Sequence, residues 1–175
     1  MVCVSMAIVL ILFLFIRFGL ETVEKMVDWA LENVPPSVNP SALEIGCGNG
    51  TLLLGLVEAG YGPLSLYGID YSEGAVKLAQ EVAKTRGGTE ITYSRCDFLV
   101  DDPPAPRSGA NRDKVDFWDL LLDKGTYDAI ALGPKDEDGR SPAIKYPGRV
   151  TRLLTSGGLF LITCKQIMTA LNMPA

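Results

Sequence analysis

A glycine-rich stretch that follows a short apolar run is the part of the sequence that points most clearly to chemistry. Residues 43–50 read Leu-Glu-Ile-Gly-Cys-Gly-Asn-Gly, and residues 68–70 read Gly-Ile-Asp. Glycines between a strand and a helix let the backbone approach a ligand closely, because no Cβ atom intervenes. An acidic residue at the end of the next strand can accept hydrogen bonds from the two hydroxyls of a ribose. The two motifs together predict a βαβ unit that binds a nucleoside.

The spacing of the glycines narrows the class of nucleoside. A dinucleotide fingerprint, Gly-x-Gly-x-x-Gly, would require glycine at position 51, where this chain has Thr51. The dinucleotide loop presents a helix N-terminus to a pyrophosphate, whereas S-adenosylmethionine contains no phosphate. A carboxylate in front of the loop also suits a ligand that carries an amine and a sulfonium. We therefore predict an S-adenosylmethionine site that includes Glu44, Gly46, Gly48, Gly50 and Asp70. The alternative is a glycine-rich turn without a ligand.

Further candidate residues follow the later apolar runs. Tyr71 follows Asp70 directly and is assigned to the same cofactor site. Asp97 is expected to accept a hydrogen bond from the adenine amine while the Phe98 ring lies on the base, or else to cap a loop. Asp123 is the candidate catalytic residue, because a carboxylate there could orient an amine for methyl transfer. The alternative for Asp123 is a structural carboxylate that caps the turn at residues 124–126.

Composition limits the classes of function. The chain has 175 residues, enough for one domain with one core, and its net charge of −5 provides no basic surface for nonspecific nucleic-acid binding. It contains no histidine, which excludes histidine-dependent triads and histidine metal sites. The four cysteines are widely spaced without a Cys-x-x-Cys pair, so no zinc site is expected and a reducing compartment is suitable. We expect no metal and no nucleic-acid partner.

Apolar periodicity predicts strands that alternate with helices. Short apolar runs predict five strands, at residues 42–45, 64–69, 90–94, 117–122 and 159–163. Helical spacing, with Ser72 as an N-cap, predicts four helices at residues 21–32, 51–59, 72–84 and 147–154. This alternation predicts an α/β, Rossmann-like fold with a doubly wound, mainly parallel sheet. In such a sheet, ligands bind beyond the carboxyl ends of the strands.

Residues 1–16 differ in character from the rest of the chain. Residues 2–16 are apolar apart from Ser5, and Arg17 ends the run. As a helix this run would span roughly 22 Å, less than the ~30 Å hydrocarbon core of a membrane. Three interpretations stay open: a weak signal anchor, a buried element, or an atypical start outside the domain. We place the domain at residues 17–175 and expect no membrane partner, with weak membrane association through residues 1–16 as the alternative.

Several motifs resemble a known family. Residues 44–50 and 68–72 (Gly-Ile-Asp-Tyr-Ser) are similar to motifs of seven-strand class I methyltransferases. Residues 122–130, Leu-Asp-Lys-Gly-Thr-Tyr-Asp-Ala-Ile, resemble more narrowly the lysine methyltransferases that modify translation elongation factor 1-alpha. The resemblance implies lysine N-methylation of elongation factor 1-alpha in the cytoplasm, with S-adenosylmethionine as the cofactor.

The chain departs from the family pattern at three places. Arg17 stands where the family usually has Trp, Gly133-Pro134 replaces Asn-Pro, and residues 164–175 differ from the polar and aromatic segment of the family. We therefore expect a chain truncated at its C-terminus, without the last strands of the class and with an open sheet edge at residues 159–163. Two alternative functions remain: a cofactor-binding fold with weak or no catalysis, and a methyltransferase that acts on a small molecule or another protein.

Overall fold

The computed structural model describes residues 8–12, 20–106 and 117–164. Their strands form one six-stranded sheet in the order β1-β6-β5-β2-β3-β4, and every neighbouring pair is parallel. The strands are β1 (Ile8–Leu12), β2 (Ala42–Ile45), β3 (Leu66–Asp70), β4 (Thr92–Arg95), β5 (Trp118–Lys124) and β6 (Leu154–Thr163). The predicted α/β, doubly wound class is confirmed, and the direction of winding changes between β2 and β5.

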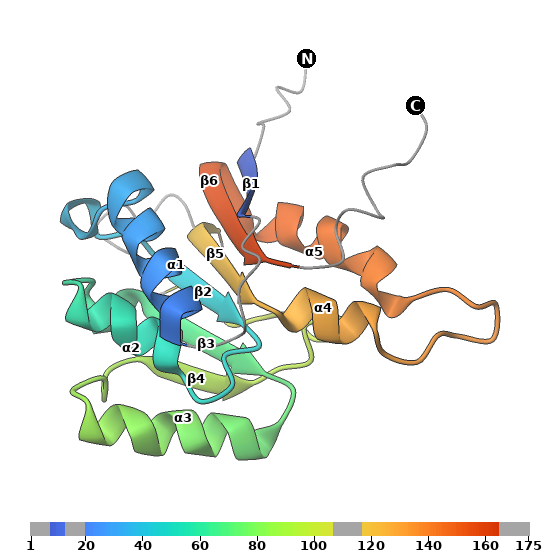
Figure 1. The fold of residues 1–175 in the computed structure, drawn as a ribbon, viewed down its shortest axis with the longest axis horizontal. Helices are drawn as coiled ribbons and strands as arrows, with labels where there is room; N and C mark the ends of the chain where they lie inside the picture. Colours follow the sequence, from blue (N-terminus) through green and yellow to red (C-terminus); the bar gives the residue numbers. More distant parts are fainter. Residues whose placement is uncertain (1–7, 13–19, 107–116, 165–175) are drawn as a thin grey trace.

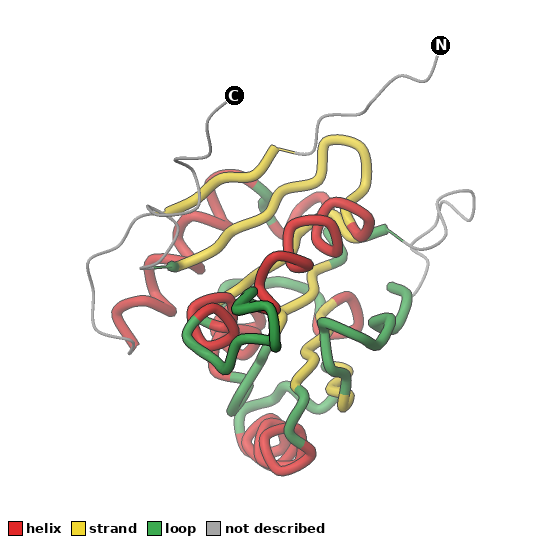
Figure 2. The backbone as a smooth tube through the Cα atoms, turned by 90° about the vertical axis from the view of Figure 1, so that its right-hand side faces the viewer, coloured by secondary structure: helices red, strands yellow, loops and turns green. Residues whose placement is uncertain are grey.

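Helices cover both faces of this sheet (Figure 1). They are α1 (Leu20–Asn33), α2 (Thr51–Glu58), α3 (Glu73–Thr85), α4 (Thr126–Ala131) and α5 (Tyr146–Leu153). Figure 2 shows helices on either side of the strands in a view turned by a right angle. Helices α1, α2 and α3 pack on one face, and α4 and α5 lie on the other.

The core is split into two parts by the sheet, as strand alternation requires. Along β2, Ala42 packs with α1, α2 and α3, whereas Leu43 and Ile45 pack on the opposite face with Trp118 and Tyr146. All four residues of β2 are buried, which is why its sequence reads as an apolar run interrupted only by Glu44. A carboxylate that is buried among these apolar residues is therefore unusual.

Several element boundaries differ from those expected. Ser72 caps α3 as predicted, its Oγ accepting a hydrogen bond from the Ala75 N–H at 3.4 Å. Strand β6 begins at Leu154, five residues earlier than the predicted start at residue 159. Residues 155–158, where we expected a break between helix and strand, form an irregularity within the strand. Gly157 permits this with φ +80. Helix α4 was not predicted, because six residues are too few to show helical periodicity.

The prediction of an open sheet edge at residues 159–163 is wrong. Strand β1 pairs in parallel with β6, with Ile8 opposite Leu159 and Leu12 opposite Thr163. An apolar run carries no signal that separates a sheet strand from a short helix, so the sequence left this pairing undetected. The domain boundary at residue 17 stays a prediction. Among the described residues, no helix has the length and apolar content needed to cross a membrane.

Candidate functional site

A pocket of about 500 Å³ opens at the carboxyl ends of β2, β3 and β5, beside the loop that follows β4. It brings together five of the predicted site residues: Gly46, Asp70, Tyr71, Asp97 and Phe98. Glu44, Gly48, Gly50 and Asp123 do not line it. The pocket also includes residues of α4 and of the loop beyond it, so its walls come from both halves of the sheet.

The glycine loop is held against β3 by its first two amides. The N–H groups of Gly46 and Cys47 donate to the Ile69 carbonyl at 2.8 and 2.9 Å. Gly46 has φ +71, and a Cβ atom there would lie 1.9 Å from Thr126 Oγ1. Gly48 has φ +54, but a Cβ atom there would meet nothing within 4 Å. Gly46 is therefore required for packing, whereas Gly48 faces open space that a ligand can use.

Asp70 links the glycine loop to the start of α3. Its Oδ2 accepts a hydrogen bond from the Gly48 N–H at 3.0 Å, and its Oδ1 accepts one from the Ser72 N–H at 2.9 Å. The residue is only 8% exposed but lines the pocket. Each carboxylate oxygen can accept a second hydrogen bond, so Asp70 retains acceptors for a ligand diol.

Asp97 and Phe98, from the loop after β4, also line the pocket. Asp97 Oδ1 accepts from the Leu99 N–H at 3.0 Å, so its carboxylate also shapes the loop after β4. The Phe98 ring is buried and packs on the Tyr146 ring, with 4.8 Å between centroids. Tyr71 lies at the rim and is 75% exposed. An apolar ring beside a carboxylate is the arrangement that a purine with an exocyclic amine requires.

Asp123 is buried near the end of β5, and its carboxylate caps the start of α4. Its Oδ1 accepts from the Thr126 N–H at 2.6 Å, and its Oδ2 accepts from the Tyr127 N–H at 2.9 Å and from the Tyr146 hydroxyl. Burial raises the pKa of Asp123 to about 6, and the Tyr146 hydrogen bond opposes that shift. These contacts fit the turn-capping interpretation of Asp123. Its role in orienting an amine stays a prediction.

Three of the pocket residues that the sequence did not identify, Lys124, Gly125 and Thr126, belong to the Asp-Lys-Gly-Thr motif. Thr126 donates its hydroxyl to the Ile45 carbonyl at 2.8 Å and so attaches α4 to β2, 81 residues away. Lys124 lines the pocket beside Gly125. In the sequence, this motif served as a sign of family resemblance and as a turn that Asp123 could cap. Its chemistry, a carboxylate and a hydroxyl around a glycine turn, was the signal that could have identified these residues.

Glu44 is fully buried on β2, beneath the glycine loop. Neither carboxylate oxygen has a side-chain or backbone partner of normal hydrogen-bond geometry among the described residues. Burial raises the pKa of Glu44 to about 8, and the charge of Lys124 and the nearby Leu53 N–H oppose the shift, while Asp123 and Asp70 add to it. The raised pKa favours the protonated, neutral form of Glu44 at neutral pH.

We expect the Glu44→Gln variant to lose part of the pH dependence of stability. Folding raises the Glu44 pKa from 4.5 to about 8, so the folded protein binds an extra proton between these values. The free energy of unfolding should consequently fall as pH rises from 4.5 to 8, by roughly 3 to 5 kcal/mol from this group. Urea unfolding at pH 5 and pH 8 measures the difference. The exposed Glu32→Gln variant is the control, and an unchanged pH slope in Glu44→Gln would contradict the assignment.

The charges around the pocket favour a cationic ligand. Its ionisable lining consists of Asp70, Asp97, Lys124, Tyr71 and the thiol of Cys96. Phosphate groups usually require several cations or a helix N-terminus, and one lysine beside two carboxylates is a poor match. Among the described residues, no group of three or more cysteine or acidic side chains is arranged to hold a metal ion.

Residues 37–173 match a methyltransferase domain. The chain belongs to this methyltransferase family. Its similarity extends to protein-lysine N-methyltransferase efm4 of Schizosaccharomyces pombe, with 35% identity over 83% of this chain and 63% of that protein. The EEF1A lysine methyltransferase 2 of Mus musculus is 34% identical over 85% of this chain and 54% of its own length. The chain thus spans slightly more than half the length of these curated relatives.

A solved structure supports the same fold. The magnesium protoporphyrin IX methyltransferase from Synechocystis PCC 6803, determined with bound SAH, aligns with a TM-score of 0.54 and 22% identity. The alignment covers 77% of this chain and 51% of that one. At this identity the likeness establishes the Rossmann-like methyltransferase fold and not the substrate.

Proposed function

We propose that this protein is an S-adenosylmethionine-dependent methyltransferase that modifies a lysine of a protein substrate, translation elongation factor 1-alpha, in the cytoplasm. The observation that carries the proposal is the single pocket in which the Gly46 loop, Asp70 and Asp97-Phe98 converge. The names of the relatives support lysine as the acceptor and elongation factor 1-alpha as the substrate.

The residues of the pocket fit this cofactor. Asp70 offers its remaining lone pairs to the ribose hydroxyls. Gly48 does not line the pocket, but it faces open space into which the methionine part can extend close to the backbone. Asp97 and Phe98 suit the amine and the face of adenine. The pocket has two carboxylates and one lysine, which favours a ligand with a sulfonium and an amine.

The side chains around the pocket would act mainly by orientation and by exclusion of water. S-adenosylmethionine, when bound, supplies a methyl group on a positively charged sulfur. Ile130, Pro134 and Pro142 form an apolar wall beside the cofactor site. A lysine amine held there loses hydration, which lowers its pKa and favours the neutral, nucleophilic form. Asp123 contributes as a positioning residue, because its hydrogen bonds hold the first turn of α4 against the pocket.

A second hollow adjoins the pocket and provides a path for the substrate. It has a volume of about 510 Å³ and shares Pro134 and Pro142 with the cofactor pocket. It is formed by the loop between α4 and α5, which projects from the body of the fold (Figure 1). Ile144 is 74% exposed there, and the lining has three cations, Lys135, Arg140 and Lys145, against Asp136. We infer that a substrate segment with apolar and acidic residues around its lysine lies in this hollow.

The test is methyl transfer from labelled S-adenosylmethionine to recombinant elongation factor 1-alpha. We expect label on a lysine of the factor. The Ile144→Asp variant should raise KM for the factor about tenfold while cofactor affinity is unchanged, because Ile144 contacts only the substrate hollow. Mass spectrometry of the product identifies the modified lysine.

Two outcomes would redirect the proposal. Labelling of a different protein in a cell lysate, with the factor untouched, would retain the methyltransferase activity but reject the substrate. Cofactor binding by calorimetry without transfer to any protein would favour a cofactor-binding fold without catalysis. The exposed Leu64→Asp variant, which lies away from both hollows, is the control for solubility.

A further inference from the structure

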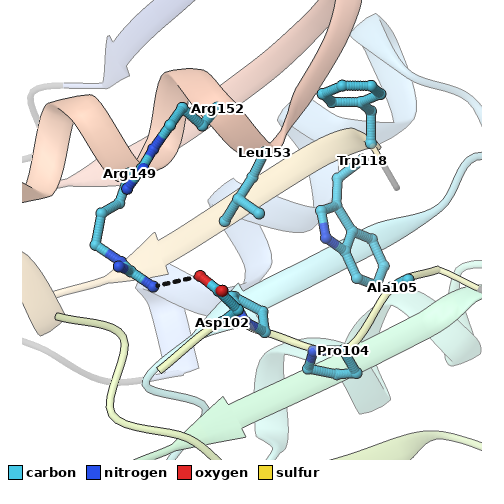
Figure 3. A pocket seen from close by; sticks show the side chains of 9 residues that line it. Asp102, Pro104, Ala105, Trp118, Arg149, Arg152 and Leu153 are labelled. Atoms are coloured by element: carbon cyan, nitrogen blue, oxygen red, sulfur yellow. Dashed lines mark hydrogen bonds and ion pairs between the residues drawn. The ribbon is translucent and has the colours of Figure 1, made fainter. Parts of the chain in front are cut away.

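A second pocket, of about 420 Å³, lies at the amino end of β5, away from the cofactor pocket (Figure 3). Its walls are α5 on one side and residues 102–105 and 117–118 on the other. It shares no lining residue with the cofactor pocket. Arg149 stands between the two, with its guanidinium 5.5 Å from the centroid of the Phe98 ring.

Two of the residues that line this pocket have a buried hydrogen-bond donor without an acceptor among the described residues. The Trp118 side chain is fully buried, and its indole N–H has no acceptor among the described residues. In Figure 3 the indole nitrogen points toward Leu153 and Asp102, across the pocket. The Arg149 Nε–H is also buried without an acceptor. A buried donor without a partner destabilises a fold, so two of them at one cavity favour a bound ligand that supplies an acceptor.

The charge of the pocket is positive. Arg149 donates through one NH2 group to the Asp101 carbonyl and to Asp102 Oδ1, the latter at 3.3 Å. The Asp102 side chain is 99% exposed, so this ion pair is largely screened by water. Arg152 also lines the pocket and donates its Nε–H to the Gly148 carbonyl at 3.2 Å. In the described part of the chain, Arg152 makes no ion pair, so its charge is available to a ligand.

The rest of the lining is apolar. Leu153, Phe117 and Pro104 contribute hydrocarbon surface next to the two guanidinium groups. The volume falls within the range of pockets that hold small organic molecules. A ligand that matches these walls has an anionic group for the arginines, an acceptor for the indole N–H, and an apolar part for Leu153.

We propose that this pocket is a second ligand site, which binds a small organic anion that carries a phosphate or a carboxylate next to an apolar group. The anionic oxygens lie between Arg149 and Arg152 and accept from Trp118 Nε1. The site is separate from the cofactor pocket and does not depend on the proposed methyltransferase activity.

Trp118 can serve as a fluorescence probe of this pocket, because the chain has only two tryptophans. In a Trp29→Phe background, the fluorescence of Trp118 is followed while phenyl phosphate or benzoate is added. We expect a saturable change with at least one of these anions at millimolar concentration, and none with phenol, which lacks the charge. The Arg152→Gln variant should weaken the binding about tenfold, because it removes one of the two cations.

The control is Arg86→Gln, which removes another exposed arginine on the far side of the sheet, where it pairs with Glu58 at 2.6 Å. It should bind the anion as the parent does. Cofactor titration of Arg152→Gln should be unchanged, because Arg152 does not touch the cofactor pocket. No saturable signal with either anion, equal binding of phenol, or unchanged binding in Arg152→Gln would overturn the proposal.

Discussion

The Asp70→Ala variant is expected to bind S-adenosylmethionine 30- to 1000-fold more weakly than the parent protein, a loss of about 2 to 4 kcal/mol. The substitution removes the carboxylate oxygens that we propose as acceptors for both ribose hydroxyls. It also frees the N–H groups of Gly48 and Ser72, which the carboxylate holds at 3.0 and 2.9 Å. Isothermal titration calorimetry with the cofactor measures the change in affinity.

Asp119→Ala is the matched control for this variant. Asp119 also lies on a strand and also accepts a backbone hydrogen bond, from the Ser41 N–H at 2.9 Å, but at the opposite end of the sheet. Its replacement should lower stability without changing cofactor affinity. If Asp70→Ala and Asp119→Ala bind the cofactor equally well, the ribose does not lie at Asp70.

The Gly46→Ala variant is expected to lose about 3 kcal/mol or more of unfolding free energy. Its Cβ would approach Thr126 Oγ1 to 1.9 Å, and its φ of +71 is unfavourable for alanine. The clash would push α4 away from β2, because the Thr126 hydroxyl bonds to Ile45 at the same point. Urea unfolding measures the loss, and cofactor titration should show weakened binding as well.

Two companion variants separate the clash from the backbone strain. Gly48→Ala has the same kind of strain at φ +54 but open space around its Cβ, so it should cost only about 1 to 2 kcal/mol while still obstructing the cofactor. Adding Thr126→Ala to Gly46→Ala should recover part of the lost stability, since it removes the hydroxyl and methyl that clash. Equal losses in Gly46→Ala and Gly48→Ala would show that packing against Thr126 is not the cause.

Much of the fold and part of the site followed from local sequence. The run around Gly46 and the Gly-Ile-Asp that ends at Asp70 identified a strand, a close backbone turn and a second strand, because glycine conformation and strand apolarity are local properties. The Ser72 cap was readable for the same reason. Five of the nine predicted site residues meet in one pocket because parallel strands align their carboxyl ends.

The remaining contacts depend on segments that are distant in sequence. Asp123 stands next to Lys124 in the chain, yet it is buried against Tyr146 while Lys124 lines the pocket, because successive strand residues point to opposite faces. The sequence predicts that side chains alternate between the two faces of the sheet, but it does not show which face α5 covers. The sequence likewise predicted that Glu44 would be a carboxylate of the cofactor site. It is buried beneath the glycine loop because α1 and α2 pack on the face of the sheet to which its side chain belongs.

The sequence by itself determined the class of fold, the nucleoside-type loop and the acidic residue at Asp70, since each depends on residues that are neighbours in the chain. The tertiary structure alone decided three things: the pairing of β1 with β6, the attachment of Thr126 to Ile45, and the meeting of Trp118, Arg149 and Arg152 around a second pocket. Each joins segments about 30 to 150 residues apart, and such contacts are selected by the packing of the whole domain and not by any local pattern.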